Sequence, residues 1–379
     1  MATVRPAKRP RLPSDSTAPL RNARLRIDLS SLLRGMHMQG AFVAAGKPPF
    51  RIHSVHEKQP KFLHGAGVRY SARSTRWYRW SLRCTSSESR TTNTAAPTEK
   101  LGFIGGTGNM GSSIIKGLIE VQALSPQHIL CSGRDAQKLE RFSIETGCTA
   151  MTDLATLCAQ STALFLCVKP AQCQAVLERM VAEAGESLNG KRLISVAAGV
   201  PVSALERPLR VEAVEQCRCR VLRCMPNVLV RHGLGAMAVS RGTTATDEDV
   251  SWALQLLGRL GLVAELEESL MDATVAAAGS SPAFAFIFME ALTDAAVREG
   301  LPRHIARSFV AQTLCGAAQM ALRDSDAHFG ELRNRVESPG GTTIAGSCAL
   351  EENGFRKAVI AAAAAAAAKS RAFADRFSA

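Results

Sequence analysis

Residues 100–379 of this chain lack tyrosine, because both tyrosines, Tyr70 and Tyr78, lie among the first 99 residues. A reductase that depends on a Tyr-x-x-x-Lys pair is therefore excluded. Histidine is scarce in the same part of the chain, which holds only His128, His232, His304 and His328. None of these has an obvious partner for acid–base catalysis, so a dehydrogenase built on a catalytic histidine is disfavoured.

Long apolar runs and paired cysteines are also missing. The longest apolar run, Val359–Ala368, is mostly alanine, and it is much shorter than the roughly 20 residues that a membrane-spanning helix needs. The 11 cysteines form no C-x-x-C pair, and Cys217, Cys219 and Cys224 have no histidines nearby at zinc spacing. We therefore expect reduced thiols, no metal site and no membrane partner.

The basic charge of the chain is confined to one end. The net charge is +13, and the first 99 residues contain 18 basic against 5 acidic side chains, whereas residues 100–379 contain 28 of each sign. Residues 100–379 therefore lack the excess of basic side chains that marks a folded nucleic-acid-binding domain, and such a role would rest on the basic extension alone. We expect no nucleic-acid partner.

Residues 1–99 read as a basic, low-complexity and disordered extension, rich in arginine and serine. A transit peptide, best matched by Val68–Arg83, is one interpretation. A nuclear signal at Lys8–Arg11 is a second. The third is an extension without function, since Met36 and Met38 could serve as alternative starts. The location of the protein, cytoplasmic or mitochondrial, stays open at this stage.

A glycine-rich turn follows a short apolar stretch at Leu101–Gly111, whose sequence is LGFIGGTGNMG. Gly106, Gly108 and Gly111 have the spacing G-x-G-x-x-G. In that pattern the first glycine makes the turn, the second lets a pyrophosphate approach the backbone, and the third lets helix and strand pack closely. A helix from Asn109 would direct its positive end at the phosphates. The stretch predicts a dinucleotide site that includes Gly106, Thr107, Gly108, Asn109 and Met110.

Strands and helices are predicted to alternate from Lys100 onward. Buried strands are expected at 101–104, 128–131, 163–168 and 193–197, with helices between them, and further strands at 218–224, 235–240 and 262–265. A helix is expected over Asp247–Leu257 with Thr246 as its N-cap. This alternation predicts an α/β fold with a parallel sheet covered on both faces, a Rossmann-type dinucleotide-binding domain over residues 100–266.

Beyond Glu267 the strand signals stop. Helices are expected over 269–278, 282–299, 302–322, 329–336, 343–350 and 354–374, so residues 267–379 read as an all-α domain. Its small side chains, above all Ala361–Ala368, bury little area within one chain. Such a layer is expected to pack against a second copy of itself, as a dimerisation domain.

The end of the second predicted strand selects the nicotinamide cofactor. Ser132 and Arg134 stand where a ribose 2′-phosphate would bind, with Lys138 one helical turn further on. Asp135 comes one residue late for binding a ribose hydroxyl, and it reads better as the N-cap of the next helix. NADPH is therefore favoured over NADH, and a solvated arginine without a ligand is the alternative for Arg134. Lys169, at the end of the strand predicted at 163–168, is either a cofactor contact or a charged strand terminus.

The loop between two predicted helices at 338–346, SPGGTTIAG, does not resemble a packing turn. Two glycines followed by threonines at a helix start expose consecutive N–H groups, and these can bind a carboxylate without any charged side chain. A helix–helix turn with a threonine cap is the alternative, and it would need only one glycine.

These strings together are similar to those of the Δ1-pyrroline-5-carboxylate reductases, over about residues 100–375. The resemblance rests on FIGGTGNMG, Val168–Pro170, SVAAGV at 195–200, RCMPN at 223–227, and SPGGTTIAG at 338–346 followed by GFR. It implies a Rossmann domain and a helical domain that interlocks with a partner into a homodimer, with rings of dimers also common. It implies hydride transfer from NADPH, or from NADH, to the C=N bond of (S)-1-pyrroline-5-carboxylate, giving L-proline.

The resemblance also assigns residues. Gly341 and Thr342 would bind the substrate carboxylate through their N–H groups, and Thr343 would hydrogen-bond the ring nitrogen. The predicted substrate site comprises Ser338, Gly340, Gly341, Thr342, Thr343 and Asn227. The implied cofactor contacts beyond the glycine turn and the second strand are Val168, Lys169, Pro170, Ala198, Met225 and Pro226.

Several positions depart from the family pattern. The glycine turn is one residue longer than usual, and Val228, Val275, Ala278 and Ser281 replace the family's residues. A non-catalytic NADPH-binding regulatory protein is the alternative function that these departures would support. A β-hydroxyacid dehydrogenase would need a catalytic lysine in its second domain, and residues 266–355 contain no lysine.

Overall fold

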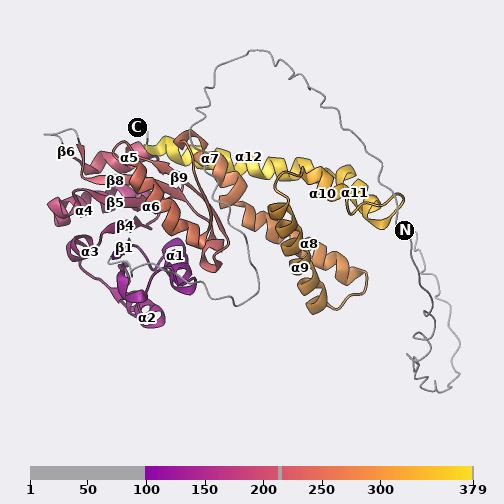
Figure 1. The fold of residues 1–379 in the computed structure, drawn as a ribbon, viewed down its shortest axis with the longest axis horizontal. Coiled ribbons are helices and arrows are strands. Elements are labelled where there is room, and N and C mark those ends of the chain that lie inside the picture. Colours follow the sequence, from indigo (N-terminus) through magenta and orange to yellow (C-terminus); the bar gives the residue numbers. More distant parts are fainter. Residues whose placement is uncertain (1–98, 212–215, 378–379) are drawn as a thin grey trace, which may run out of the picture. The chain divides into compact units, whose positions relative to one another are not determined.

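A computed structural model describes residues 99–211 and 216–377 of the chain (Figure 1). The predictions made for the basic extension, including its disorder and its three interpretations, lie outside the described residues.

The centre of the fold is an eight-stranded sheet with the order β10-β9-β8-β5-β4-β1-β2-β3. Neighbouring strands are parallel except β8 and β9, which are antiparallel. The strands are β1 Leu101–Ile104, β2 Ile129–Cys131, β3 Thr149–Ala150, β4 Ala163–Leu166, β5 Lys191–Ser195, β8 Cys219–Met225, β9 Gly235–Arg241 and β10 Gly261–Glu265. A separate antiparallel pair joins β6 Arg210–Val211 to β7 Gln216–Cys217. The chain leaves β1 toward β2 on one side and returns to β4 on the other, the arrangement of a doubly wound dinucleotide fold.

Helices cover both faces of this sheet (Figure 1). The helices α1 Asn109–Glu120, α2 Ala136–Thr146 and α6 Asp247–Leu257 contribute to one buried cluster. The helices α3 Leu154–Gln160, α4 Cys173–Ala184 and α5 Val202–Glu206 contribute to the other. The predicted α/β architecture is confirmed, and it follows from strands that are apolar on both sides.

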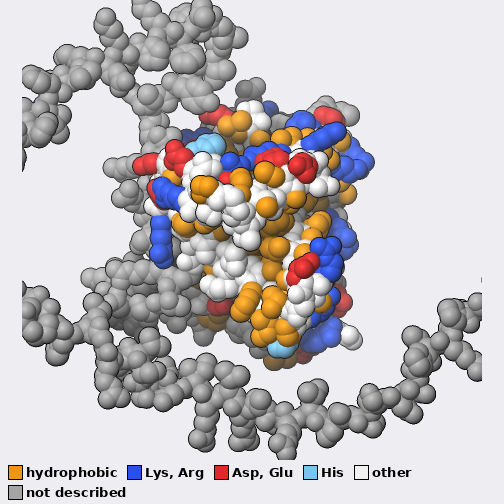
Figure 2. Space-filling model, turned by 90° about the vertical axis from the view of Figure 1, so that its right-hand side faces the viewer, with side chains coloured by type: hydrophobic (Ala, Val, Ile, Leu, Met, Phe, Trp, Pro, Cys, Tyr) orange, Lys and Arg blue, Asp and Glu red, His pale blue; other side chains and the backbone are white. Residues whose placement is uncertain are grey.

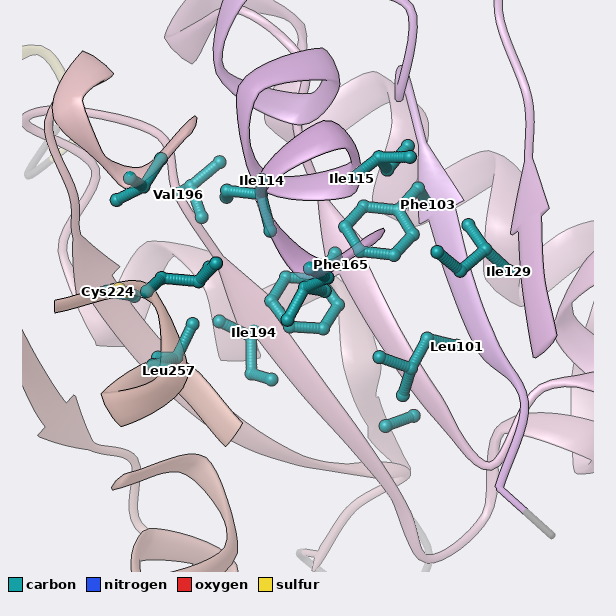
Figure 3. Packing of buried hydrophobic residues seen from close by; sticks show 14 of the residues in the cluster. Leu101, Phe103, Ile114, Ile115, Ile129, Phe165, Ile194, Val196, Cys224 and Leu257 are labelled. Atoms are coloured by element: carbon teal, nitrogen blue, oxygen red, sulfur yellow. The ribbon is translucent and has the colours of Figure 1, made fainter. Parts of the chain in front are cut away.

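Side-chain alternation along the central strands builds the two clusters. Leu101 and Phe103 of β1 face the α1 side, whereas Ile104 faces the α4 side. The rings of Phe103 and Phe165 stack at 4.6 Å between neighbouring strands (Figure 3). Ile114 and Ile115 of α1 lie over these rings and are fully buried. This packing anchors α1, whose N-terminus the glycine turn presents.

Residues 268–377 contain helices and no strand among the described positions. The α-helices are α7 Met271–Thr274, α8 Ser281–Arg298, α9 Arg303–Arg323, α10 Phe329–Asn334, α11 Thr342–Glu352 and α12 Phe355–Ala374. The helix expected over 269–278 is instead a 3-10 turn at Glu268–Leu270, then α7, then a π-helical turn at Val275–Gly279. The spacing of apolar residues in the sequence does not distinguish a 3-10 turn, an α-helix and a π-helical turn.

Large apolar side chains stand exposed on these helices. Phe286 and Ile287 of α8 are 57% and 65% exposed, and Ile360 of α12 is 68% exposed. Figure 2 shows hydrophobic side chains at the surface of one face of the described part. By length and composition the stretch Glu268–Arg298 could cross a membrane, and 11% of its most apolar window is buried. One such stretch is weak evidence for a membrane, because an apolar helix that packs on a partner passes the same test.

Candidate functional site

The glycine turn leads directly into the N-terminus of α1. Gly105 adopts φ +75°, and its carbonyl accepts a hydrogen bond from the Gly108 N–H at 3.0 Å. The helix begins at Asn109 with Gly108 as N-cap, and the first helical N–H bond comes from Ser112 to the Gly108 carbonyl. The N–H groups of the intervening helical residues therefore point outward, where they can bind phosphate.

The left-handed turn residue is Gly105, which directly precedes the G-x-G-x-x-G glycines that begin at Gly106. A side chain at Gly105 would be strained by its positive φ and would lie 2.9 Å from Val168 Cγ1. A Cβ at Gly106 would lie 2.6 Å from the sulfur of Cys131 and 2.9 Å from Cβ of Phe103. A Cβ at Gly111 would lie 2.8 Å from Cα of Gly106, so Gly111 allows close packing as predicted. Gly106 therefore lies tightly against β1 and β2, where only a glycine fits.

The end of β2 lies beside this turn. The Gly106 N–H donates to the Ser132 carbonyl at 2.9 Å, which joins the two strand ends. Arg134 and Lys138 are exposed, as a phosphate site requires. The Asp135 carboxylate accepts from the Lys138 N–H at 3.0 Å and caps α2, which confirms its predicted role. A carboxylate committed to a helix N-terminus does not compete for a ribose hydroxyl.

The segment after β4 borders the turn on its other side. Val168 contacts Gly105, and the Cys167 carbonyl would lie 3.2 Å from a Cβ at Gly105. Lys169 is exposed and precedes the 3-10 turn Pro170–Gln172. The strand itself ends at Leu166, two residues earlier than predicted. Val168–Pro170 thus lies at the crevice between β1 and β4, where the strand order reverses and dinucleotides bind in such sheets.

The loop after β5 contacts the C-terminal helix. Gly199 adopts φ +72°, and a Cβ there would lie 2.7 Å from Cβ of Phe373 and 3.2 Å from the Ser370 carbonyl, both of α12. Ala198, a predicted cofactor contact, is half-buried next to it. The predicted cofactor loop and the C-terminal helix therefore share one tight contact.

Asn227 ties the end of β8 to the helical domain. Its side-chain oxygen accepts from the Leu229 N–H at 3.1 Å, and its amide nitrogen donates to the Ala278 carbonyl at 3.1 Å. Met225 lies against the same π-helical turn, since a Cβ at Gly279 would lie 2.6 Å from its methyl carbon. Asn227 is 3% exposed and Pro226 is also buried. The predicted cofactor contacts Met225 and Pro226 and the predicted substrate residue Asn227 thus lie at a junction of the two domains, and Asn227 has a structural part in it.

A second junction was not foreseen from the sequence. Arg223 of β8 is 4% exposed, and its Nη1 lies 2.9 Å from Glu268 Oε1. The same Glu268 oxygen accepts from the Val202 N–H at 2.8 Å. Asp272 lies 3.9 Å from Arg223 Nη2 and accepts a 2.6 Å hydrogen bond from Ser370. An arginine inside the predicted strand 218–224 was the available signal, because a buried arginine requires carboxylate partners.

The predicted substrate loop stands exposed. Ser338, Gly340, Thr342 and Thr343 are exposed, and Gly340 adopts φ +68°. α11 begins at Thr342, so the N–H groups of its first turn have no intrahelical acceptor. The Gly341 N–H donates to the Ser338 carbonyl at 3.0 Å. Of the two donors assigned to the carboxylate, the Thr342 N–H faces outward and the Gly341 N–H already serves the turn.

The loop and the glycine turn are not joined within one chain. Among the described residues, no hydrogen bond or ion pair connects 338–343 to 99–266. Nothing lies within 4 Å of a Cβ placed at Gly340 or Gly346. The substrate loop therefore lacks packing partners from its own nucleotide-binding domain.

The thiols around the cofactor turn are held protonated. Burial raises the pKa of Cys224 to about 12 and raises the pKa of Cys167 further still. A hydrogen bond with Cys148, together with burial, raises the pKa of Cys131. Deprotonated thiolates are the nucleophilic form, so these cysteines serve as packing groups. Across the described residues, no group of three or more histidine, cysteine, aspartate or glutamate side chains is arranged to hold a metal.

Two family models match the chain. One, for NADP oxidoreductases dependent on coenzyme F420, matches residues 100–199, and the other, for pyrroline-5-carboxylate reductase dimerisation, matches residues 268–373. The pyrroline-5-carboxylate reductase of Methanosarcina acetivorans is 39% identical over 273 residues, 72% of this chain and 97% of that protein. That of Escherichia coli K12 is 35% identical over 273 residues, with the same two coverages of 72% and 97%.

A solved structure agrees with these matches. The NADP-bound pyrroline carboxylate reductase of Plasmodium falciparum superimposes with a TM-score of 0.65 at 28% identity, covering 74% of this chain and 100% of that one. Fold and site define a nicotinamide-dependent oxidoreductase, with a Rossmann domain followed by a helical dimerisation domain. The chain belongs to the pyrroline-5-carboxylate reductase family.

Proposed function

We propose that this protein reduces the C=N bond of (S)-1-pyrroline-5-carboxylate to give L-proline, the last step of proline biosynthesis. The observation that carries the proposal is the loop Ser338–Thr343, which presents free N–H groups and a threonine hydroxyl at the start of α11. The family membership supplies the reaction. The non-catalytic alternative is disfavoured, because a regulatory nucleotide-binding protein has no need of this loop.

The residues of the crevice fit a dinucleotide. The N-terminus of α1 would hold the pyrophosphate, and Val168–Pro170 and Ala198 would flank the nicotinamide half. Bound NAD(P)H supplies a hydride to the substrate carbon. We propose NADPH as the preferred form, supported by the exposed Arg134 and Lys138 and by the capping role of Asp135.

The substrate loop provides orientation and neutralises charge. The Thr342 N–H and the positive end of α11 would bind the carboxylate of the substrate. The Thr343 hydroxyl would hydrogen-bond the ring nitrogen and so hold the C=N carbon in line for hydride attack. The imine is basic enough to carry its own proton, so the nitrogen becomes an amine without a strong general acid from the protein.

The site requires two chains in this proposal. The loop stands exposed without contacts to its own nucleotide-binding domain, and the neighbouring helices expose large apolar side chains. We propose a homodimer in which the loop of one chain closes over the nicotinamide held by the other. We also propose that such dimers assemble into rings. For the location of the protein we propose the cytoplasm or the mitochondrion.

The direct test follows NADPH oxidation with pyrroline-5-carboxylate as substrate. We expect turnover by the wild type and a roughly tenfold to hundredfold lower kcat for Thr343→Ala, with Thr343→Ser retaining most of the activity. A folded dimer without turnover at saturating substrate would overturn the proposed activity.

Sharing of the site is tested by combining two impaired chains in one dimer. Gly108→Asp would repel the pyrophosphate, and Thr343→Ala would impair the substrate loop. Coexpression with two different tags allows the mixed dimer to be isolated. A shared site predicts about half of the wild-type activity for the mixed dimer, since one of its two sites is intact. A mixed dimer as inactive as its parents would show that each loop serves its own chain.

A further inference from the structure

Thr107 carries the one side chain larger than hydrogen within the glycine turn Gly105–Gly108, which follows β1. It is 9% exposed. Among residues 99–211 and 216–377 its hydroxyl has no hydrogen-bond partner. It is also not one of the fully enclosed side-chain atoms that lack a partner there. The oxygen is therefore nearly buried, unpaired and still reachable from the crevice.

The hydroxyl points at the end of β2. A Cβ placed at Gly133 would lie 2.6 Å from Thr107 Oγ1 and 3.2 Å from its methyl carbon. Gly133 stands between Ser132 and Arg134, and the Gly106 N–H to Ser132 carbonyl bond fixes the turn against this segment. Residues from two strand ends thus converge where the adenosine ribose of a dinucleotide lies in such folds.

The three side chains have complementary chemistry. Arg134 is exposed and supplies charge, whereas Ser132 and Thr107 supply hydroxyl donors. The Ser132 hydroxyl makes one long bond of 3.4 Å to the Phe103 carbonyl, so it is weakly engaged. A phosphate dianion offers three strong acceptors to such a set, whereas a ribose hydroxyl offers one. An unpaired, nearly buried hydroxyl is costly unless a ligand or water completes its hydrogen bonding.

We infer that Thr107 is a specificity-determining residue that donates a hydrogen bond to the ribose 2′-phosphate of NADPH. The inference rests on the proposed nicotinamide site and adds a phosphate contact from the glycine turn. It also accounts for glycine at position 133, because any side chain there would displace the Thr107 hydroxyl.

The test measures equilibrium binding, with no substrate present. Calorimetric Kd values are determined for NADP⁺, NAD⁺ and 2′,5′-ADP with the wild type, Thr107→Val and Thr107→Ser. Hydrogen bonds to charged groups change affinity by about tenfold to hundredfold. We expect Thr107→Val to weaken NADP⁺ and 2′,5′-ADP by at least tenfold and NAD⁺ by less than twofold. Thr107→Ser keeps the hydroxyl and should stay within about threefold of wild type.

Two further variants test whether the loss of NADP⁺ affinity comes from the position of the Thr107 hydroxyl. Gly133→Ala forces the hydroxyl away without removing it, and it should reproduce the selective loss of NADP⁺ affinity. Thr149→Val removes an exposed hydroxyl on β3 and should change no affinity. Equal weakening of NADP⁺ and NAD⁺ in Thr107→Val would place the hydroxyl on the pyrophosphate or in the turn, and no weakening would make it a packing group. Either result overturns the inference.

The outcome is separable from the proposed reaction. A protein that shows the Thr107 binding pattern but never reduces pyrroline-5-carboxylate would retain this inference and lose the proposed function. A protein that reduces pyrroline-5-carboxylate, but whose nucleotide selectivity is unchanged in Thr107→Val, would retain the proposed function and lose this inference.

Discussion

The guanidinium of Arg223 lies 2.9 Å from the carboxylate of Glu268, and the pair joins the sheet to the first turn of the helical domain. Arg223 is almost fully buried, whereas the side chain of Glu268 is 36% exposed. Removing Glu268 would therefore leave a buried guanidinium without a partner, whereas removing Arg223 would leave a carboxylate that water can reach. This asymmetry makes the junction testable.

Removing the acidic side should cost more than removing the arginine. Glu268→Gln with Asp272→Asn leaves a buried guanidinium uncompensated, and we expect a loss of about 3 kcal/mol in the free energy of unfolding. Arg223→Met leaves carboxylates that can rehydrate, so we expect about 1 kcal/mol. Urea denaturation of the purified proteins measures both. Equal losses would show that the arginine is not effectively desolvated.

Asn227 is predicted to act through the contact with Ala278. Asn227→Asp keeps the acceptor for the Leu229 N–H but places a carboxylate oxygen against a carbonyl. We expect a loss of about 1–2 kcal/mol in stability, with a fall in kcat because the adjoining predicted cofactor contacts, Met225 and Pro226, would shift. Asn189→Asp, on an exposed loop, is the control and should change stability by less than about 0.5 kcal/mol. Unchanged stability together with a raised substrate KM would instead assign Asn227 to the substrate.

Alanine substitutions at Gly105 and Gly108 should impair different properties, fold stability in the first case and nucleotide binding in the second. Gly105→Ala combines a positive φ with a close approach to Val168, so it should destabilise the fold by roughly 2 kcal/mol. Gly108 has φ −72°, and an added Cβ would lie 3.2 Å from the Gly105 carbonyl. We expect Gly108→Ala to retain near wild-type stability and to weaken NADPH binding. Thermal unfolding with and without the nucleotide separates the two effects.

The exposed apolar face of α8 should hold the oligomer together. Ile287→Glu places a charge on that face, and we expect monomers in light scattering and loss of turnover. Ile144, on α2 of the nucleotide-binding domain, is 78% exposed and provides the matched control. Ile144→Glu should keep the assembly of the wild type. A dimeric, active Ile287→Glu protein would move the interface elsewhere.

The ion pairs of Asp249 should make the stability of the fold sensitive to acid. Burial favours its protonated form, but hydrogen bonds from Thr246 and ion pairs with Arg192 and Arg220 outweigh it, so the pKa lies below its ordinary value. A lowered pKa in the folded state stabilises the fold above the unfolded pKa of about 4, and this stabilisation is lost as the pH falls further. The stability gap between wild type and Asp249→Asn should therefore be wide at pH 7 and narrow below pH 4. A gap independent of pH would contradict the charge-based account.

Local signals in the sequence predicted much of the nucleotide-binding domain. The caps at Asp135 and Thr246 are where residue type and spacing place them, since a cap depends on three or four neighbouring residues. The sequence did not reveal which glycine takes the left-handed conformation. Gly105 and Gly106 are chemically identical, and contacts with Val168 and Cys131, far along the chain, decide between them.

The sequence predicted the individual motifs of the candidate site, but it did not predict how they come together in space. The strings around Thr343 and Gly108 are readable because each forms a helix N-terminus on its own. Arg223 and Glu268 are 45 residues apart, so nothing local joins them. The predicted substrate loop could not be matched to a nicotinamide site either, because within one chain it makes no hydrogen bond or ion pair with the described residues 99–211 and 216–266.

The contact between Gly199 and Phe373 joins the C-terminal helix to the loop after β5 and predicts a coupling between assembly and cofactor affinity. Any shift of α12 on forming the oligomer would be transmitted to the loop that holds the predicted cofactor contact Ala198, because no space separates Gly199 from Phe373. Binding equilibria that share such an element are reciprocal. Dilution that dissociates the oligomer should then weaken nucleotide binding, and saturating nucleotide should shift the midpoint of dissociation to lower protein concentration.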